Sequence, residues 1–136
     1  MKTAQNLSNL FGRLLIVALF LPAGVSKLMN FEGTLGYFNS LGMPAPSLAL
    51  IIAIVVELLG GIALILGFQT RIVAIVLAVF TFAATLLGHA YWAVPAEQAF
   101  VTQLLFFKNI AVIGGLLVLA ASGAGKYSID GRNELI

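Results

Sequence analysis

Cysteine is absent from this chain, histidine occurs once, and charged residues are scarce. Without cysteine there are no disulfides, no thiol redox chemistry, no iron–sulfur ligation and no thiolate zinc site. A single histidine also argues against a metal or haem site built from several imidazoles. Only 9% of the residues are charged, whereas an ordinary soluble domain has roughly 25%. The net charge of +2 rests on so few groups that it does not indicate a nucleic-acid partner.

Apolar residues are abundant, since 61% of the 136 residues are hydrophobic. A soluble domain of this size leaves a large share of its surface in water and could not hide so many apolar side chains. This composition excludes a soluble globular enzyme and a disordered segment. It predicts a membrane protein whose main contact is the lipid bilayer.

Four apolar stretches are each long enough to cross a bilayer as a helix, which takes about 20 residues. They cover approximately residues 7–28, 47–68, 70–91 and 100–122, with glycine- and proline-containing turns between them. The first contains Arg13 and Pro22, and no small-residue cleavage site follows it, so we interpret it as a retained span and not as a signal peptide. We therefore expect an all-α membrane protein, a four-transmembrane-helix bundle in one domain over residues 1–136.

Lysine and arginine lie mostly on one side of these spans. The side that holds both termini would carry five of them: Lys2, Arg13, Arg71, Lys126 and Arg132. The other side has Lys27, and Lys108 falls inside a span. Because positive residues favour the cytoplasmic side, we expect both termini to be cytoplasmic.

The connection between the first two spans is the longest one. Within Asn30–Leu41, apolar residues recur at helical spacing. This pattern fits a short amphipathic helix lying on the outer surface. A packed loop that caps the bundle explains the same residues equally well.

Two ionisable residues lie deep inside spans. Glu57 is about ten residues from the outer end of the second span, or roughly 15 Å deep, and Lys108 is about eight residues inside the fourth, or roughly 12 Å deep. Charges at such depth are costly and usually find a partner. We expect Glu57 and Lys108 to meet or to share a water.

The remaining polar groups sit on helix faces that also carry small residues, which let membrane helices approach closely. Turning these faces inward predicts a polar pocket in the outer half of the bundle. Its candidate ligand-binding residues are Lys27, Glu57, His89, Lys108 and Asn109. Secondary candidates are Phe20, Thr85, Trp92 and Arg13.

Structural roles compete with this interpretation. A buried Glu–Lys pair can simply fix helix register, and a lone histidine at an interface is often a packing residue. For Arg13 and Arg71 we expect the side chains to extend to the lipid headgroups, and we expect the Gly60-Gly61 and Gly114-Gly115 pairs to serve helix packing.

The chain resembles the DoxX family of small bacterial inner-membrane proteins. The likeness rests on the order and spacing of short motifs along nearly the whole chain. These are Arg13-Leu-Leu, Pro22-Ala-Gly-Val-Ser-Lys27-Leu, Leu41-Gly-Met-Pro-Ala-Pro46, Val56-Glu57-Leu-Leu-Gly-Gly61, Leu66-Gly-Phe-Gln-Thr-Arg71, His89, Phe107-Lys108-Asn109-Ile-Ala111 with Gly114-Gly115, and Gly123-Ala-Gly-Lys-Tyr-Ser-Ile-Asp130.

The resemblance implies a multi-pass protein of the bacterial inner membrane. It also implies a redox-linked subunit, at most an oxidoreductase-associated one, because the family takes its name from a subunit of a quinone-linked oxidase. A bound quinone is the cofactor to expect, and a second copy of the chain or another membrane protein is the partner. Two other functions fit the residues: a small proton-coupled transporter, and a non-catalytic structural or assembly subunit of a membrane complex. No residue pattern specifies a metal site or a catalytic residue.

Overall fold

The computed structural model describes residues 2–133, and all regular structure within that range is helical. The elements are α1 (Lys2–Met29), α2 (Phe31–Ser40), α3 (Pro46–Leu66), α4 (Thr70–Gly88), the short 3₁₀ helix η1 (Tyr91–Ala93), α5 (Ala96–Ser122) and α6 (Ile129–Asn133). Helices α1, α3, α4 and α5 are long and apolar enough to span a membrane, α4 being counted together with η1. The expected four-helix membrane bundle is confirmed.

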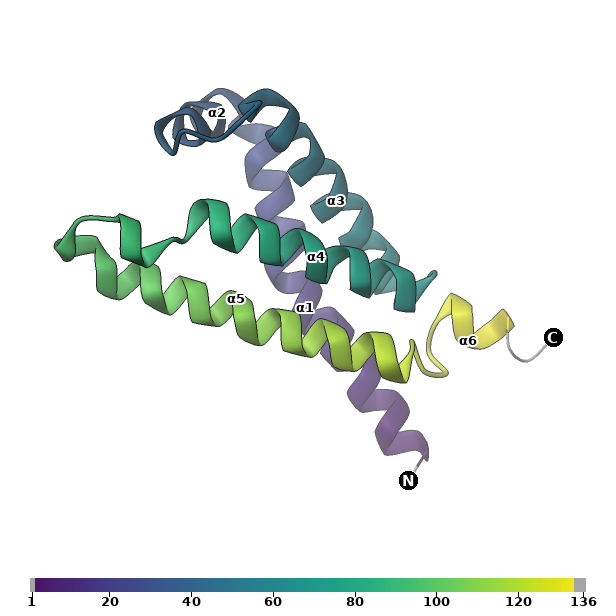
Figure 1. The fold of residues 1–136 in the computed structure, drawn as a ribbon. Helices are drawn as coiled ribbons and strands as arrows, with labels where there is room; N and C mark the ends of the chain where they lie inside the picture. The colour runs from purple at the N-terminus through teal and green to yellow at the C-terminus, as the bar shows by residue number, and fades with distance from the viewer. Residues whose placement is uncertain (1, 134–136) are drawn as a thin grey trace.

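The four long helices are arranged as two pairs. Helix α1 packs along α3 and helix α4 packs along α5, while a smaller contact between α3 and α4 joins the pairs. The pairs lie close together at the end that carries α6 and diverge toward α2 and η1 (Figure 1). At the α2 end the divergence separates α1 and α3 from α4 and α5, and the candidate site lies in the space between the two pairs.

The turn between α3 and α4 is only three residues long, and glycine makes it possible. Gly67 adopts a left-handed conformation with φ +67°. The Phe68 and Gly67 amides donate to the Ala63 and Leu64 carbonyls at 2.9 and 3.3 Å, which is the Schellman pattern that ends a helix. Gln69 follows with φ +48°, and α4 begins at the next residue.

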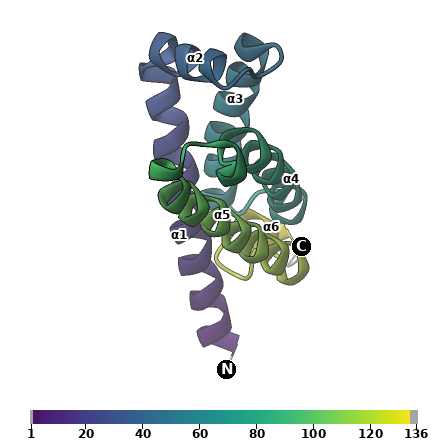
Figure 2. The ribbon, with the colours of Figure 1, turned by 60° about the vertical axis from the view of Figure 1, so that its left-hand side comes forward.

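The connection between α1 and α3 contains a helix, which decides between the two interpretations of Asn30–Leu41. Helix α2 lies across the ends of α1 and α3 (Figure 2), and none of its residues is buried. It therefore covers one end of the bundle without contributing to its core.

The core lies where all four long helices meet. Its buried side chains are Val17, Phe20, Leu64, Ala74, Leu77, Ala78, Leu116 and Leu119. Large apolar side chains on the outer faces stay exposed, among them Leu15 and Val118 at 74% and 69%. An exposed apolar surface of this kind suits contact with lipid chains instead of water.

Both described ends of the chain lie at the α6 end of the bundle. The Asn9 side chain donates to the Gly123 carbonyl at 2.6 Å, and the Lys126 amide donates to the Asn6 side chain at 3.0 Å. An even number of spans therefore places the two ends of the chain on the same side of the bundle, as expected. That this end faces the cytoplasm stays a prediction from the distribution of lysine and arginine.

Candidate functional site

A cavity of about 620 Å³ lies between the diverging helix pairs at the α2 end. All five principal candidates line it: Lys27, Glu57, His89, Lys108 and Asn109. They come from α1, α3, the residue after α4, and α5. Most of the remaining lining is apolar, so a few polar groups converge in a hydrophobic space, as in typical small-molecule sites.

Lys27 and Glu57 form an ion pair on the wall made by α1 and α3. The Lys27 Nζ atom lies 3.1 Å from both Glu57 carboxylate oxygens. The Glu57 side chain is 7% exposed and that of Lys27 is 24% exposed. Gly24 allows this contact, since a Cβ atom there would lie 3.1 Å from the Glu57 Cβ and 2.9 Å from the Leu58 side chain.

The prediction of a direct contact between Glu57 and Lys108 was wrong, because the carboxylate of Glu57 is bound by Lys27. Equal depth in the bilayer suggested Lys108, but α3 packs along α1 and not along α5. Lys108 lines the same cavity on the α5 wall. A water shared between Glu57 and Lys108 stays a prediction.

Asn109 is held by α4. Its side-chain amide donates to the Thr85 hydroxyl at 3.0 Å, and that hydroxyl donates to the Thr81 carbonyl at 2.6 Å. Thr85 is fully buried and Asn109 is 8% exposed. This chain of hydrogen bonds fixes α5 against α4 and so fixes the position of Lys108, the preceding residue.

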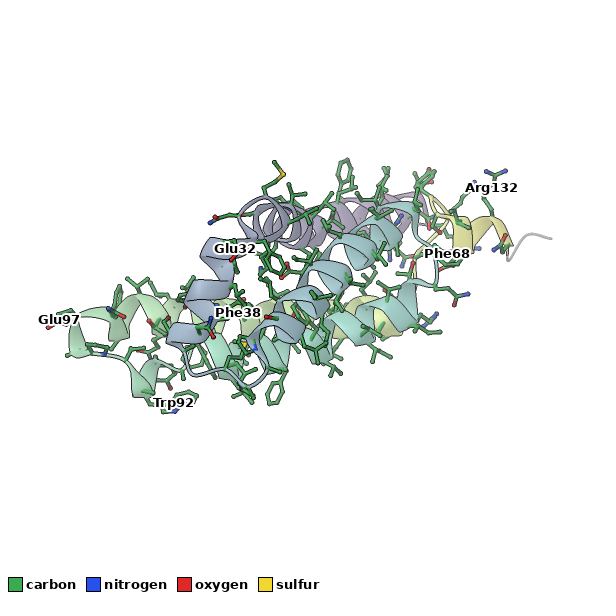
Figure 3. The ribbon with its side chains drawn as sticks, turned by 90° about the horizontal axis from the view of Figure 1, so that it is seen from above. Glu32, Phe38, Phe68, Trp92, Glu97 and Arg132 are labelled. Carbon is green, nitrogen blue, oxygen red and sulfur yellow. The ribbon has the colours of Figure 1, made fainter. Side chains whose placement is uncertain are left out.

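The aromatic secondary candidates differ in position. Phe20 lines the cavity and is 4% exposed. Trp92 does not line the cavity and is 61% exposed; it stacks edge-on against Tyr91 and Phe106 at centroid distances of 5.2 and 5.7 Å. Figure 3 shows Trp92 and Glu97 at one end of the molecule and Phe68 and Arg132 at the other.

Arg13 does not extend to the headgroups as expected. It is fully buried at the α6 end, away from the cavity. Its guanidinium donates to the Leu64 and Ile65 carbonyls at 2.8 and 3.2 Å and also to the Tyr127 carbonyl. The expectation failed because the carbonyl groups at the end of α3 and the chain after α5 provide acceptors that a sequence does not reveal.

Arg71 and Asp130 complete a set of helix-end contacts at the same end of the bundle. Arg71, expected to extend to the headgroups, donates to the Ala120 and Ala121 carbonyls at the end of α5. The Asp130 carboxylate accepts from the Gln69 and Thr70 amides at 2.9 and 2.8 Å. Each charge thus has the sign that a helix dipole favours.

The position of Asp130 at the start of α4 lowers the pKa of its carboxyl group. Partial burial acts to raise the pKa of Asp130, but the hydrogen bonds from the Thr70 and Gln69 amides act together with the positive charge of Arg13 and hold the pKa below its usual value. The ionised carboxylate therefore helps to fasten the segment after α5 to the start of α4.

Sequence reasoning missed the contribution of α2 to the cavity. Thr34, Tyr37 and Phe38 of α2 line it, as do Leu41 and Met43 just after that helix. The helical spacing of apolar residues in 30–41 was the available signal, but it did not show which way the helix lies. Within residues 2–133, no group of three metal-ligating side chains lies close together.

Comparison with known proteins gives a consistent result. The family model described as DoxX matches residues 8–90. The inner membrane protein YphA of Escherichia coli is 38% identical over 90% of this chain and 88% of its own length. The inner membrane protein YqjF of the same organism is 38% identical over 96% of this chain and 95% of its own length.

A third relative carries a functional name. The putative oxidoreductase CatD of Bacillus subtilis is 35% identical over 65% of this chain and 60% of its own length. No solved structure matches the chain.

Proposed function

This chain belongs to the DoxX family of multi-pass inner-membrane proteins, and from that membership we propose that it is a redox-linked membrane subunit whose cavity binds a quinone or another small amphipathic molecule. One observation carries the proposal. Lys27, Glu57, His89, Lys108 and Asn109, which come from all four long helices or their ends, line one apolar cavity together, whereas Arg13 lies at the other end of the bundle. Such a cavity fits a molecule with a polar head and an apolar body.

The chemistry of the lining suits a quinone head group. Its carbonyl oxygens need hydrogen-bond donors at membrane depth, and Lys108, His89 and the Asn109 amide are donors that line the cavity. Phe20 and Phe80 offer ring faces for the head group to pack against. The name of CatD, a putative oxidoreductase, supports a redox link. Since this chain has no cysteine, its electrons would come from the bound molecule or from a partner protein.

The test is whether the purified protein carries a quinone. We expect lipid extracts of protein purified in mild detergent to contain ubiquinone or menaquinone at close to one molecule per chain by mass spectrometry. The variants H89L and K108M should lose most of it. K126M removes the same charge outside the cavity and should keep it. Quinone content no higher than in an unrelated four-span protein purified in the same way would refute quinone as the ligand, and with it the redox link, and would leave another small amphipathic molecule as the occupant of the cavity.

The buried ion pair favours a second candidate, a proton-coupled transporter. A carboxylate and an ammonium that face a cavity inside a membrane are typical of proton and substrate pathways. This function predicts substrate flux in proteoliposomes that a pH gradient drives and that Glu57→Gln abolishes. Flux that does not respond to this substitution would exclude the function.

A further inference from the structure

The cavity contains one positive charge that no group among residues 2–133 balances. Three of its lining residues carry ionisable amine or carboxylate groups: Lys27, Glu57 and Lys108. The ammonium of Lys27 already faces both oxygens of Glu57 at 3.1 Å. The charges of Lys27 and Glu57 cancel, so the ammonium of Lys108 is left without a counter-charge in the cavity lining.

No carboxylate among residues 2–133 is available to Lys108. The ion pair between Lys27 and Glu57 is the one that this part of the chain forms. Glu32 and Glu97 are exposed on α2 and on the first turn of α5. Asp130 is bound to the amides at the start of α4, at the other end of the bundle.

Lys108 is also far from either end of its helix. It lies twelve residues after Ala96, where α5 begins, which is about 18 Å along an axis of about 40 Å. A single ammonium near the middle of a span is costly unless a counter-ion or water accompanies it. Because Asn109 is anchored to Thr85, the adjacent lysine stays on the side of α5 that faces the cavity.

From these observations we infer that the cavity selects molecules whose head group is an acid, a carboxylate or a phosphate monoanion, with Lys108 as its counter-ion. The inference rests on the proposed function and narrows the class of small molecule. The apolar part of the ligand lies against Phe20, Ile52 and Leu87, which come from three of the helices around the cavity. The Lys27–Glu57 pair is a fixed part of the wall and is not the group that recognises the acid.

The decisive experiment compares dodecanoate with dodecanol, two probes of equal chain length of which only dodecanoate is charged. The protein is placed in nanodiscs of phosphatidylcholine, and binding of radiolabelled dodecanoate is measured against empty nanodiscs, with dodecanol, dodecyl phosphate and decylubiquinone as competitors. We expect dodecanoate and dodecyl phosphate to bind at least about tenfold more tightly than dodecanol, because hydrogen bonds to charged groups are strong.

Substitutions then assign the preference to one side chain. Lys108→Met should reduce the affinity for dodecanoate to that for dodecanol, and Lys108→Arg should retain the preference. Lys126→Met loses the same charge outside the cavity and should bind both probes like the original protein. Lys108→Gln gives the same comparison if the methionine variant does not fold, with folding checked by circular dichroism and gel filtration.

The outcomes separate this inference from the proposed function. Decylubiquinone binding without any preference for dodecanoate would overturn the inference and leave the proposed function standing. Absence of binding by every probe would refute both. Phosphatidylglycerol added to the nanodiscs identifies the natural source of the acid: displacement of dodecanoate through Lys108 indicates a lipid headgroup, and no displacement indicates a free single-chain acid.

Discussion

Replacing Lys27 by methionine should destabilise the bundle because it leaves the Glu57 carboxylate buried without its counter-ion. The Glu57 side chain is 7% exposed, and each of its oxygens lies 3.1 Å from the Lys27 Nζ atom. At that separation the attraction is about 5 kcal/mol for an effective dielectric constant near 20.

The net effect is smaller than this attraction, since both groups lose hydration when the protein folds. Breaking a buried pair by removing one partner typically costs about 3–5 kcal/mol. Lys27 keeps 24% of its side chain exposed, so we expect the lower end, about 3 kcal/mol. Removing both charges with K27M and E57L together should restore stability to within about 1 kcal/mol of the original protein.

Reversible unfolding in mixed micelles of dodecyl sulfate and a mild detergent, followed by circular dichroism, measures these differences. Lys126→Met is the matched control, because Lys126 is exposed and forms no ion pair with residues 2–133. If K27M unfolds at the same detergent fraction as K126M, or if the double variant is as unstable as K27M, the ion pair does not act as described.

Three further predictions concern other polar contacts. Arg13→Met removes the three hydrogen bonds to backbone carbonyls described above and a fourth, to the Asn9 side chain, from a buried position. It should cost about 3 kcal/mol or more, measured by the same unfolding assay, with faster proteolysis of the segment around Tyr127. The lowered pKa of Asp130 means that its contribution is complete above the usual aspartate range and is lost as pH falls through the lowered value. Proteolysis of the same segment should therefore accelerate in acid, and Asp130→Asn should show fast proteolysis at every pH. Asn109→Leu breaks the contact with Thr85 and should cost roughly 0.6–1.7 kcal/mol, and a loss above 3 kcal/mol would contradict a single interhelical hydrogen bond.

The polar residues contributed to the candidate site by the long helices were predictable from the sequence, but the contribution of α2 and the ion pairing within the site were not. Lys27, Glu57, His89, Lys108 and Asn109 were chosen because they are polar residues within apolar spans, and all of them line the cavity. The cost of a polar group in lipid is a property of the residue and its span, so sequence reveals it.

Sequence gives the depth of a residue along its helix, but contact between two side chains also depends on which helices are neighbours and on which way each side chain faces. Glu57 and Lys108 have similar depths, yet the helix beside Glu57 is α1, which carries Lys27. Which of three neighbouring helices packs most closely depends on small residues such as Gly24 meeting a partner surface. The same limit applies to Arg13, because three of its acceptors are backbone carbonyls more than fifty positions away.

Composition and hydropathy alone determined that this protein lies in a membrane, that it crosses four times and which residues are too costly to face lipid, because each of these follows from the transfer of single residues or single helices out of water. The tertiary structure decided that the helices form two diverging pairs, that α2 lies across the ends of α1 and α3, and that Lys27 pairs with Glu57 while Lys108 does not. These features arise from the packing of distant segments against one another, which no local pattern encodes.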